Sequence, residues 1–144
     1  MIDLLVAAVL LVIAALHVYW GVGGHWPGRD AASLAQTVVG FKNIAAMPPP
    51  AACFVVASVL AAAALWPLMV SGRIALGLPN GLLVLGSLAL TMVFLARGVA
   101  AYAPAWRQLT PEQPFARLDR QLYGPVCLIL GCLFAIVTAK GGLS

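Results

Sequence analysis

Four apolar runs, each long enough to cross a lipid bilayer, constrain the fold of this chain more than any other feature. They cover residues 2–22, 51–70, 78–100 and 121–140. The hydrocarbon core of a bilayer requires about 20 predominantly apolar residues per helical span. Because backbone amides in lipid must be hydrogen-bonded within their own segment, each run is expected to be an α-helix. The sequence therefore predicts an all-α integral membrane protein with a four-helix transmembrane bundle.

Composition and the length of the connections exclude most other classes of protein. Of the 144 residues, 63% are apolar and only 8% are charged, whereas a soluble domain of this size needs far more charged surface. The connections are too short to enclose a core of their own, so residues 1–144 are expected to form one domain. The eight basic residues form no stripe with stacking aromatic residues. We therefore expect membrane lipids, and not nucleic acid, as partners.

The even number of spans places both chain termini on one side of the membrane. The two long connections, residues 23–50 and 98–121, then lie on the other side. Six basic residues belong to the side of the long connections and two to the side of the termini. The positive-inside rule accordingly favours a cytoplasmic location for the long connections. In the first of them, the apolar residues between 34 and 41 have the spacing of a short helix on the membrane surface, with an ordered loop as the alternative.

The second apolar run is rich in alanine, at position 57 and at positions 61–64. Small side chains let helix backbones approach closely in lipid, where no hydrophobic force drives helices together. We therefore expect this helix to pack tightly on a neighbour. Replacing Ala61 or Ala62 by leucine is expected to impair folding more than Leu60→Ala does, unless that face looks into lipid.

Histidine, arginine, aspartate and aromatic residues gather at the membrane end that carries the long connections. His17 lies 15 residues after Ile2, or about 22 Å along a helix that rises about 1.5 Å per residue. A histidine at such a depth normally faces the bundle or a polar cavity and has a partner. The catalytic candidates are His17, Asp119 and Tyr123. The binding candidates are Trp20, Trp26, Arg97, Arg117 and Arg120.

These candidates together supply the groups that acid–base chemistry requires. They include a proton-transfer group, a fixed cation, an orienting carboxylate and a phenol. If the fourth helix extends back to Asp119, then Asp119, Tyr123 and Cys127 are spaced i, i+4 and i+8 and share one face. The pattern is compatible with an enzyme or with a binding protein.

Each candidate also has a purely structural explanation. The aromatic residues are typical of an interfacial belt, and Arg117 and Arg120 are typical of residues that snorkel to lipid headgroups. Asp119 has the position of a helix N-cap. His17 has the alternative of a hydrogen bond between helices.

Arg97 requires an acceptor, because an arginine at membrane depth costs from about 2.5 kcal/mol upward unless it snorkels or is paired. Asp3 lies at the opposite membrane face, whereas Asp30 and Glu112 lie in the middle of the connections. Asp119 is held at the mouth of the fourth helix. We therefore predict an ion pair between Arg97 and Asp119.

The sequence indicates no metal site and identifies no cofactor. Cys127 and Cys132 are five residues apart and point to different helix faces, so they make a poor metal clip. The two histidines are eight residues apart, at His17 and His25, and provide no axial pair for haem across two helices. We expect function to depend on His17 and not on the cysteines.

Several short motifs occur in a specific combination over nearly the whole chain. They are residues 16–20, 23–24, 26–27, 47–48, Arg97 after residues 94–96, and residues 117–125. In this combination the chain resembles the bacterial membrane family catalogued as domain of unknown function 3995. The resemblance implies four spans and a bacterial cell membrane, here the inner membrane. It brings no activity that could be transferred to particular residues.

Three functions are compatible with this pattern. The first is binding of, or action on, a lipid-soluble small molecule in a polar pocket at the end of the bundle with the long connections. The second is an accessory or assembly subunit that docks on another membrane protein. The third is a small transporter that works as a homodimer, which is disfavoured because no Asp or Glu lies deep in any run.

Overall fold

The structure is a computed structural model that describes residues 1–141, and the segments predicted to span the membrane are helical. Four helices are long and apolar enough to cross a membrane, as the sequence predicts. The first three are α1 (Ile2–Gly21), α3 (Pro50–Val70) and α4 (Asn80–Ala100). The fourth is a continuous helical stretch made of α6 (Phe115–Leu118), the π-helix η1 (Asp119–Tyr123) and α7 (Gly124–Gly141). The fold is therefore an all-α membrane protein.

The predicted ends of the first three helices are correct to within two residues. The predicted start of the fourth helix, at residue 121, is wrong, because helical structure already begins at Phe115. The sequence offers no strong stop signal there, and the π-turn at Asp119–Tyr123 allows the helix to continue with a locally wider turn. Asp119 is therefore a residue within a helical stretch, and the N-cap explanation does not apply to it.

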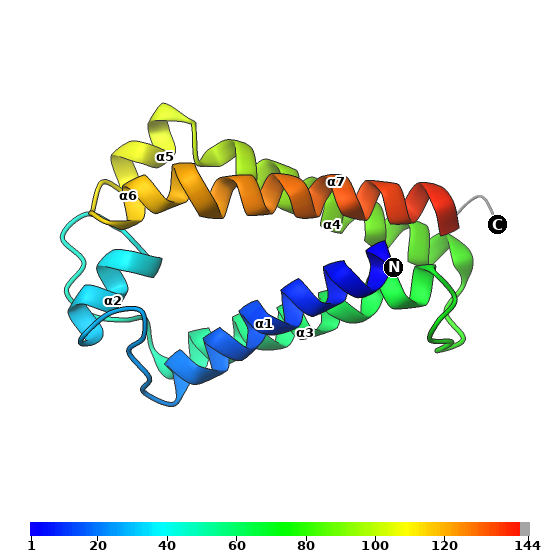
Figure 1. The fold of residues 1–144 in the computed structure, drawn as a ribbon, viewed down its shortest axis with the longest axis horizontal. Helices are drawn as coiled ribbons and strands as arrows, with labels where there is room; N and C mark the ends of the chain where they lie inside the picture. Colours follow the sequence, from blue (N-terminus) through cyan, green and yellow to red (C-terminus); the bar gives the residue numbers. More distant parts are fainter. Residues whose placement is uncertain (142–144) are drawn as a thin grey trace.

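The four long helices form two pairs, in which α1 packs along α3 and α4 packs along α7. Figure 1 shows that the pairs meet near the N-terminus and the last turns of α7 and diverge toward the opposite end. The core lies where the pairs meet. It consists of Val6, Ala7, Leu10, Ala63, Ala64, Leu130 and Phe134.

Small residues bring the paired helices together. A Cβ atom added to Gly98 of α4 would lie 2.6 Å from Leu128 Cγ of α7, and one added to Gly131 would lie 2.7 Å from Leu95. These contacts leave no room for a side chain at either glycine.

The alanine-rich helix α3 packs on α1, as its composition predicts. The buried alanines are Ala57, Ala63 and Ala64, whereas Ala62 is exposed and Ala61 is half-buried. Ala62 therefore lies on the outward face of the helix, which is the case in which replacement by leucine was not expected to impair folding.

Two short helices cover the diverging end of the bundle (Figure 1). The first long connection contains α2 (Ala31–Val38), which settles the choice between a helix and a loop there. Its N-cap is Asp30, whose carboxylate accepts a 2.8 Å hydrogen bond from the Ser33 backbone N–H. This hydrogen bond lowers the pKa of Asp30. The second long connection contains α5 (Pro104–Leu109), which the sequence analysis did not predict.

Candidate functional site

Asp119 is the most buried charged residue at the diverging end, with 1% of its surface exposed. Its Oδ1 atom accepts a 2.6 Å hydrogen bond from Arg97 Nη2, so the predicted ion pair is confirmed. Its Oδ2 atom accepts a 2.9 Å hydrogen bond from Trp106 Nε1. Both carboxylate oxygens are thus engaged, and the charge of Asp119 is compensated by a cation and by a neutral donor.

Arg97 is fixed by more than this ion pair. The centre of its guanidinium lies 5.1 Å from the centroid of the Trp106 ring, which is a cation–π distance. Its Nη1 atom is buried and has no hydrogen-bond partner among residues 1–141. The side chain as a whole is 32% exposed. Arg97 therefore keeps one donor nitrogen, Nη1, without an acceptor among the described residues.

Tyr123 lies at the end of the π-turn and contacts a different part of the protein. Its hydroxyl donates a 3.1 Å hydrogen bond to the carbonyl oxygen of Thr37 in α2. Its ring lies 5.7 Å from that of Phe115. Because a π-turn adds a residue to the helical turn, the predicted spacing i, i+4, i+8 does not describe one regular face through Asp119 and Tyr123. Tyr123 ties α2 to the fourth span.

His17 lies on the face of α1 that is turned toward the bundle. The buried positions Leu10, Ala14 and Gly21 recur at helical spacing, and residue 17 continues their stripe. The ring nitrogen Nδ1 of His17 lies 2.8 Å from the carbonyl oxygen of Ile13. A carbonyl can only accept, so Nδ1 must carry the hydrogen, and in the neutral ring Nε2 keeps a lone pair. Nε2 has no hydrogen-bond partner within the described part of the chain.

The aromatic residues after His17 form a small surface cluster. The rings of His17 and Trp20 meet edge to face, with centroids 4.9 Å apart. Trp20 Nε1 donates a 2.8 Å hydrogen bond to the carbonyl oxygen of Trp26. The Trp26 side chain itself is 64% exposed, and His25 beside it is exposed too. Trp26 thus has the environment of an interfacial anchor.

The site residues predicted as one set fall into two groups. The His17 group is made of His17, Trp20 and Trp26, on the pair of α1 and α3 and the connection that follows α1. The Asp119 group is made of Arg97, Trp106 and Asp119, on the pair of α4 and α7 and the connection between them. No hydrogen bond, ion pair or ring contact within residues 1–141 joins the groups. They belong to the ends of two helix pairs that diverge from one another (Figure 1).

Arg117 and Arg120 belong to neither group, although both flank Asp119 in the sequence. Both are exposed and line a cavity of about 310 Å³. The complete lining is Tyr102, Arg107, Ala116, Arg117, Arg120 and Gln121. We call this cavity the arginine pocket. His17 and Asp119 do not line it.

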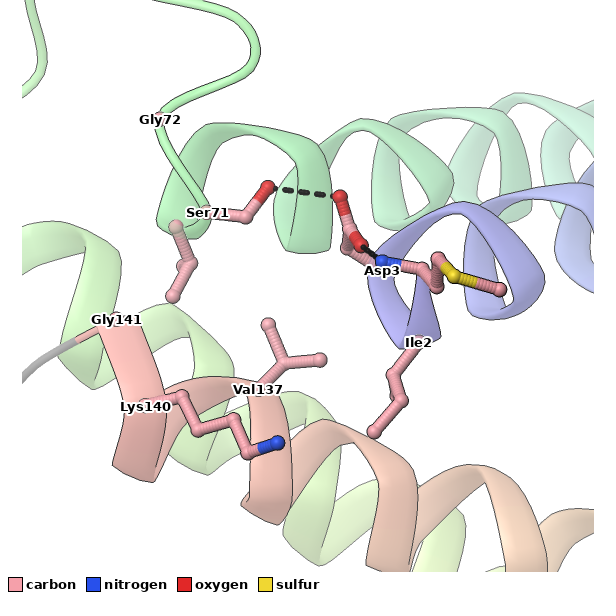
Figure 2. A pocket seen from close by; sticks show the side chains of 9 residues that line it. Ile2, Asp3, Ser71, Gly72, Val137, Lys140 and Gly141 are labelled. Atoms are coloured by element: carbon pink, nitrogen blue, oxygen red, sulfur yellow. Dashed lines mark hydrogen bonds and ion pairs between the residues drawn. The ribbon is translucent and has the colours of Figure 1, made fainter.

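A second cavity, of about 480 Å³, lies at the opposite end of the bundle, between the start of α1 and the end of α7. Figure 2 shows Asp3 at its edge, with Ser71 and the N-terminal amine turned toward the carboxylate. Asp3 accepts hydrogen bonds from the amine of Met1 at 2.7 Å, from Ser71 Oγ at 3.0 Å and from Arg73 Nε. Through these hydrogen bonds, the carboxylate connects the start of α1 to the turn between α3 and α4. We interpret this network as structural.

Sequence reasoning missed two of these partners. Trp106 lies in a connection without a helical pattern of apolar residues, so the sequence offered no reason to expect it as a hydrogen-bond donor to Asp119. The partner of Asp3, Arg73, could have been found by the same elimination that paired Arg97 with Asp119, since both residues lie at the terminal face.

Metal-ligating residues do not gather in the part of the chain that the structure describes. No group of three His, Cys, Asp or Glu side chains there could hold a metal ion. The three cysteines are free; Cys53 is buried, Cys127 is half-buried and Cys132 is exposed.

Comparison with known proteins identifies a family. No curated protein and no solved structure matches the chain. One family model matches residues 10–134, a range that includes most of all four spans and both long connections. The chain therefore belongs to the family described as Protein of unknown function (DUF3995).

Proposed function

We propose that this protein binds, or acts on, a lipid-soluble small molecule with a polar head, at the end of the bundle that carries the two long connections. The observation that carries the proposal is the environment of His17. This histidine follows the inward stripe of α1, yet it is only half-buried, and its Nε2 has no partner among the described residues. A histidine at membrane depth normally faces a polar cavity or has a partner, and a ligand head can be that partner.

The Asp119 group supplies complementary chemistry on the other helix pair. Arg97 keeps one buried donor nitrogen, Nη1, without a protein acceptor. The bond to Asp119 and the ring of Trp106 hold the guanidinium in place, so little side-chain entropy remains to be lost when an acceptor binds. A ligand head that carries a carbonyl, hydroxyl or ether oxygen would suit this donor.

The two groups differ in what they could do to a ligand. The Nε2 atom of neutral His17 is a proton acceptor, and Arg97 is a fixed cation that could stabilise negative charge on oxygen. Tyr123 is a weaker candidate for proton transfer, since its hydroxyl hydrogen is engaged with Thr37. The ligand would enter from the lipid, because the outward faces of the spans are apolar.

We further propose the bacterial inner membrane as the location, with the long connections in the cytoplasm. The resemblance of the motifs to a bacterial family supports the first statement. The excess of basic residues on the long connections supports the second.

The proposal is tested by the ligand that the protein retains on purification. The protein is extracted from native membranes in dodecyl maltoside, and the organic extract of the purified protein is quantified by mass spectrometry. We expect a lipid-soluble species, other than bulk phospholipid, in a fixed ratio to the protein. The His17→Ala variant should retain about tenfold less of it, because loss of one polar contact costs on the order of 1.4 kcal/mol.

The matched control is His25→Ala, which removes a histidine from the exposed connection eight residues away. This variant, and a variant with all three cysteines replaced by serine, should retain the ligand at the wild-type ratio. Equal retention by His17→Ala and wild type, with both proteins folded, would contradict the proposal. Co-purification of a second membrane protein in place of a small molecule would favour the accessory-subunit function.

A further inference from the structure

The arginine pocket has a composition that sets it apart from the rest of the molecule. Three of its six lining residues are arginines, contributed by α5, α6 and the π-turn, and none of the six is acidic. The remaining walls are Tyr102, Ala116 and Gln121. Its volume is about 310 Å³, well above the roughly 10–15 Å³ that holds one water molecule by the same measure. The pocket has room for a small anion or for the head of a larger one.

The positive charge of this pocket is not compensated by the protein. The ion pairs of Arg73 with Asp3 and of Arg97 with Asp119 lie outside the pocket. Among residues 1–141, no carboxylate lies within ion-pair distance of Arg107, Arg117 or Arg120. Like charges that converge on one cavity repel each other, and a bound anion removes that cost.

The walls of the pocket are fixed by hydrogen bonds to the backbone. Arg107 Nη1 points to the carbonyl oxygens of Ala101, at 3.5 Å, and Ala116, at 3.3 Å. The hydroxyl of Tyr102 donates a 3.0 Å hydrogen bond to the carbonyl oxygen of Arg120. These bonds tie the end of α4 and the helix α5 to the start of the fourth span. A guanidinium has five N–H donors, so Arg107 keeps most of them for a ligand.

We propose that the arginine pocket binds a phosphate group. Guanidinium forks match the paired oxygens of a phosphate and stay charged at every physiological pH. The pocket also lies where α4 ends and the fourth span begins, the level at which phospholipid headgroups meet a membrane protein. The phosphate belongs either to an anionic phospholipid or to a soluble molecule. This proposal is independent of the proposed function, which concerns His17 and Arg97.

The test compares two double variants of equal charge change. Arg117→Gln/Arg120→Gln removes two pocket cations whose side chains make no hydrogen bond within the described chain. Arg29→Gln/Lys42→Gln removes two exposed cations from the first long connection, on the same side of the bundle. Arg107 is left in place because its guanidinium supports the local backbone. Size-exclusion and thermal unfolding profiles confirm that both variants are folded.

Two measurements distinguish the source of the phosphate. In dodecyl maltoside, which contains no phosphate, inorganic phosphate is titrated by calorimetry. In nanodiscs of phosphatidylcholine with a minor fraction of phosphatidylglycerol, native mass spectrometry counts the phosphatidylglycerol retained after release into detergent. In at least one measurement, the wild type and the control variant should bind about tenfold more tightly than Arg117→Gln/Arg120→Gln, since each charge-assisted hydrogen bond contributes strongly.

Each outcome decides the proposal. Pocket-dependent binding of inorganic phosphate supports it and assigns a soluble phosphate compound. Pocket-dependent retention of phosphatidylglycerol alone supports it and assigns a lipid headgroup. Binding that falls equally in both double variants shows only a general effect of net charge and overturns the proposal, as does absence of binding by the wild type in both measurements.

Discussion

Replacing Asp119 by alanine should destabilise the protein by about 2.5 kcal/mol, although this residue lies at the end of the bundle and outside its core. The carboxylate is almost fully buried and accepts hydrogen bonds from Arg97 and Trp106. Removing it leaves a cation and an indole N–H without their acceptor. Loss of one partner from a buried pair is costly for this reason, even where the pair itself contributes little.

The magnitude follows from the two hydrogen bonds. A hydrogen bond to a charged group contributes about 1.5–3 kcal/mol, and an unsatisfied neutral donor costs about 1–3 kcal/mol. The Arg97 side chain is 32% exposed and can turn toward water or headgroups, so the lower end of the first range applies. Trp106 is half-buried, and the lower end of the second range applies to it. The sum of about 2.5 kcal/mol corresponds to a change of about sixtyfold in the unfolding equilibrium.

Reversible unfolding by a denaturing detergent, followed by circular dichroism in mixed micelles, measures this change. Asp119→Asn should cost less, about 1.5 kcal/mol, because the amide oxygen still accepts from Trp106 while the charge is lost. A double-mutant cycle with Arg97→Met isolates the ion pair. We expect a coupling free energy of about 1.5 kcal/mol between the two positions.

A coupling free energy below about 0.5 kcal/mol would refute the reasoning, since distant and independent sites also show values of that size. An Asp119→Ala variant as stable as the wild type would refute it too. Either result would mean that lipid headgroups or water satisfy Arg97 and Trp106 as well as Asp119 does.

Two further outcomes follow from local geometry. Gly98→Leu should abolish folding or strongly lower the unfolding temperature, because even a Cβ atom would lie 2.6 Å from Leu128. Gly81→Ala is the control. No atom lies within 4 Å of the added Cβ there, so this variant should be neutral in the same thermal assay. Asp30→Ala should speed amide hydrogen exchange in α2, because the capping bond to Ser33 is lost. Since the pKa of Asp30 is lowered from its usual value, the cap is fully present above that usual value and is lost as the pH falls through the lowered one. After each exchange rate is divided by the intrinsic rate at the same pH, acid should therefore reduce the protection of wild-type α2 and not that of the variant.

The sequence determined the existence of the four spans and the bounds of the first three, because both are local properties. A run of apolar residues between polar connections must be helical in lipid, whatever its neighbours are. The pairing of Arg97 with Asp119 could also be predicted, since the chain has only four acidic residues and the other three lie at the opposite membrane face or in the middle of a connection. The residues of α2 had a helical spacing, but an ordered loop was an equal alternative until the structure showed the helix. A count or a period along the chain decided the spans and the ion pair.

The pairing of α1 with α3 and of α4 with α7 was decided only by the tertiary structure. Helices α3 and α7 are apolar on all sides, so their residue pattern does not separate the face toward lipid from the face toward the bundle. Lipid tails and leucine side chains are equally apolar, so hydrophobicity does not select the partner of a helix. The selection depends on shape, for example where the missing side chain of Gly98 leaves space for Leu128. For the same reason, Ala62 and Ala63 could not be ranked from sequence.

The division of the candidate site was likewise a matter of three-dimensional arrangement. His17 and Arg97 both lie at the same end of the bundle. The sequence predicted how deep each residue lies in the membrane, but not which residues are neighbours at that depth. The divergence of the two helix pairs, the π-turn that begins at Asp119 and the short helix that carries Trp106 then determined which side chains meet. These features arise from packing between segments distant along the chain, and no local pattern of residues encodes such contacts.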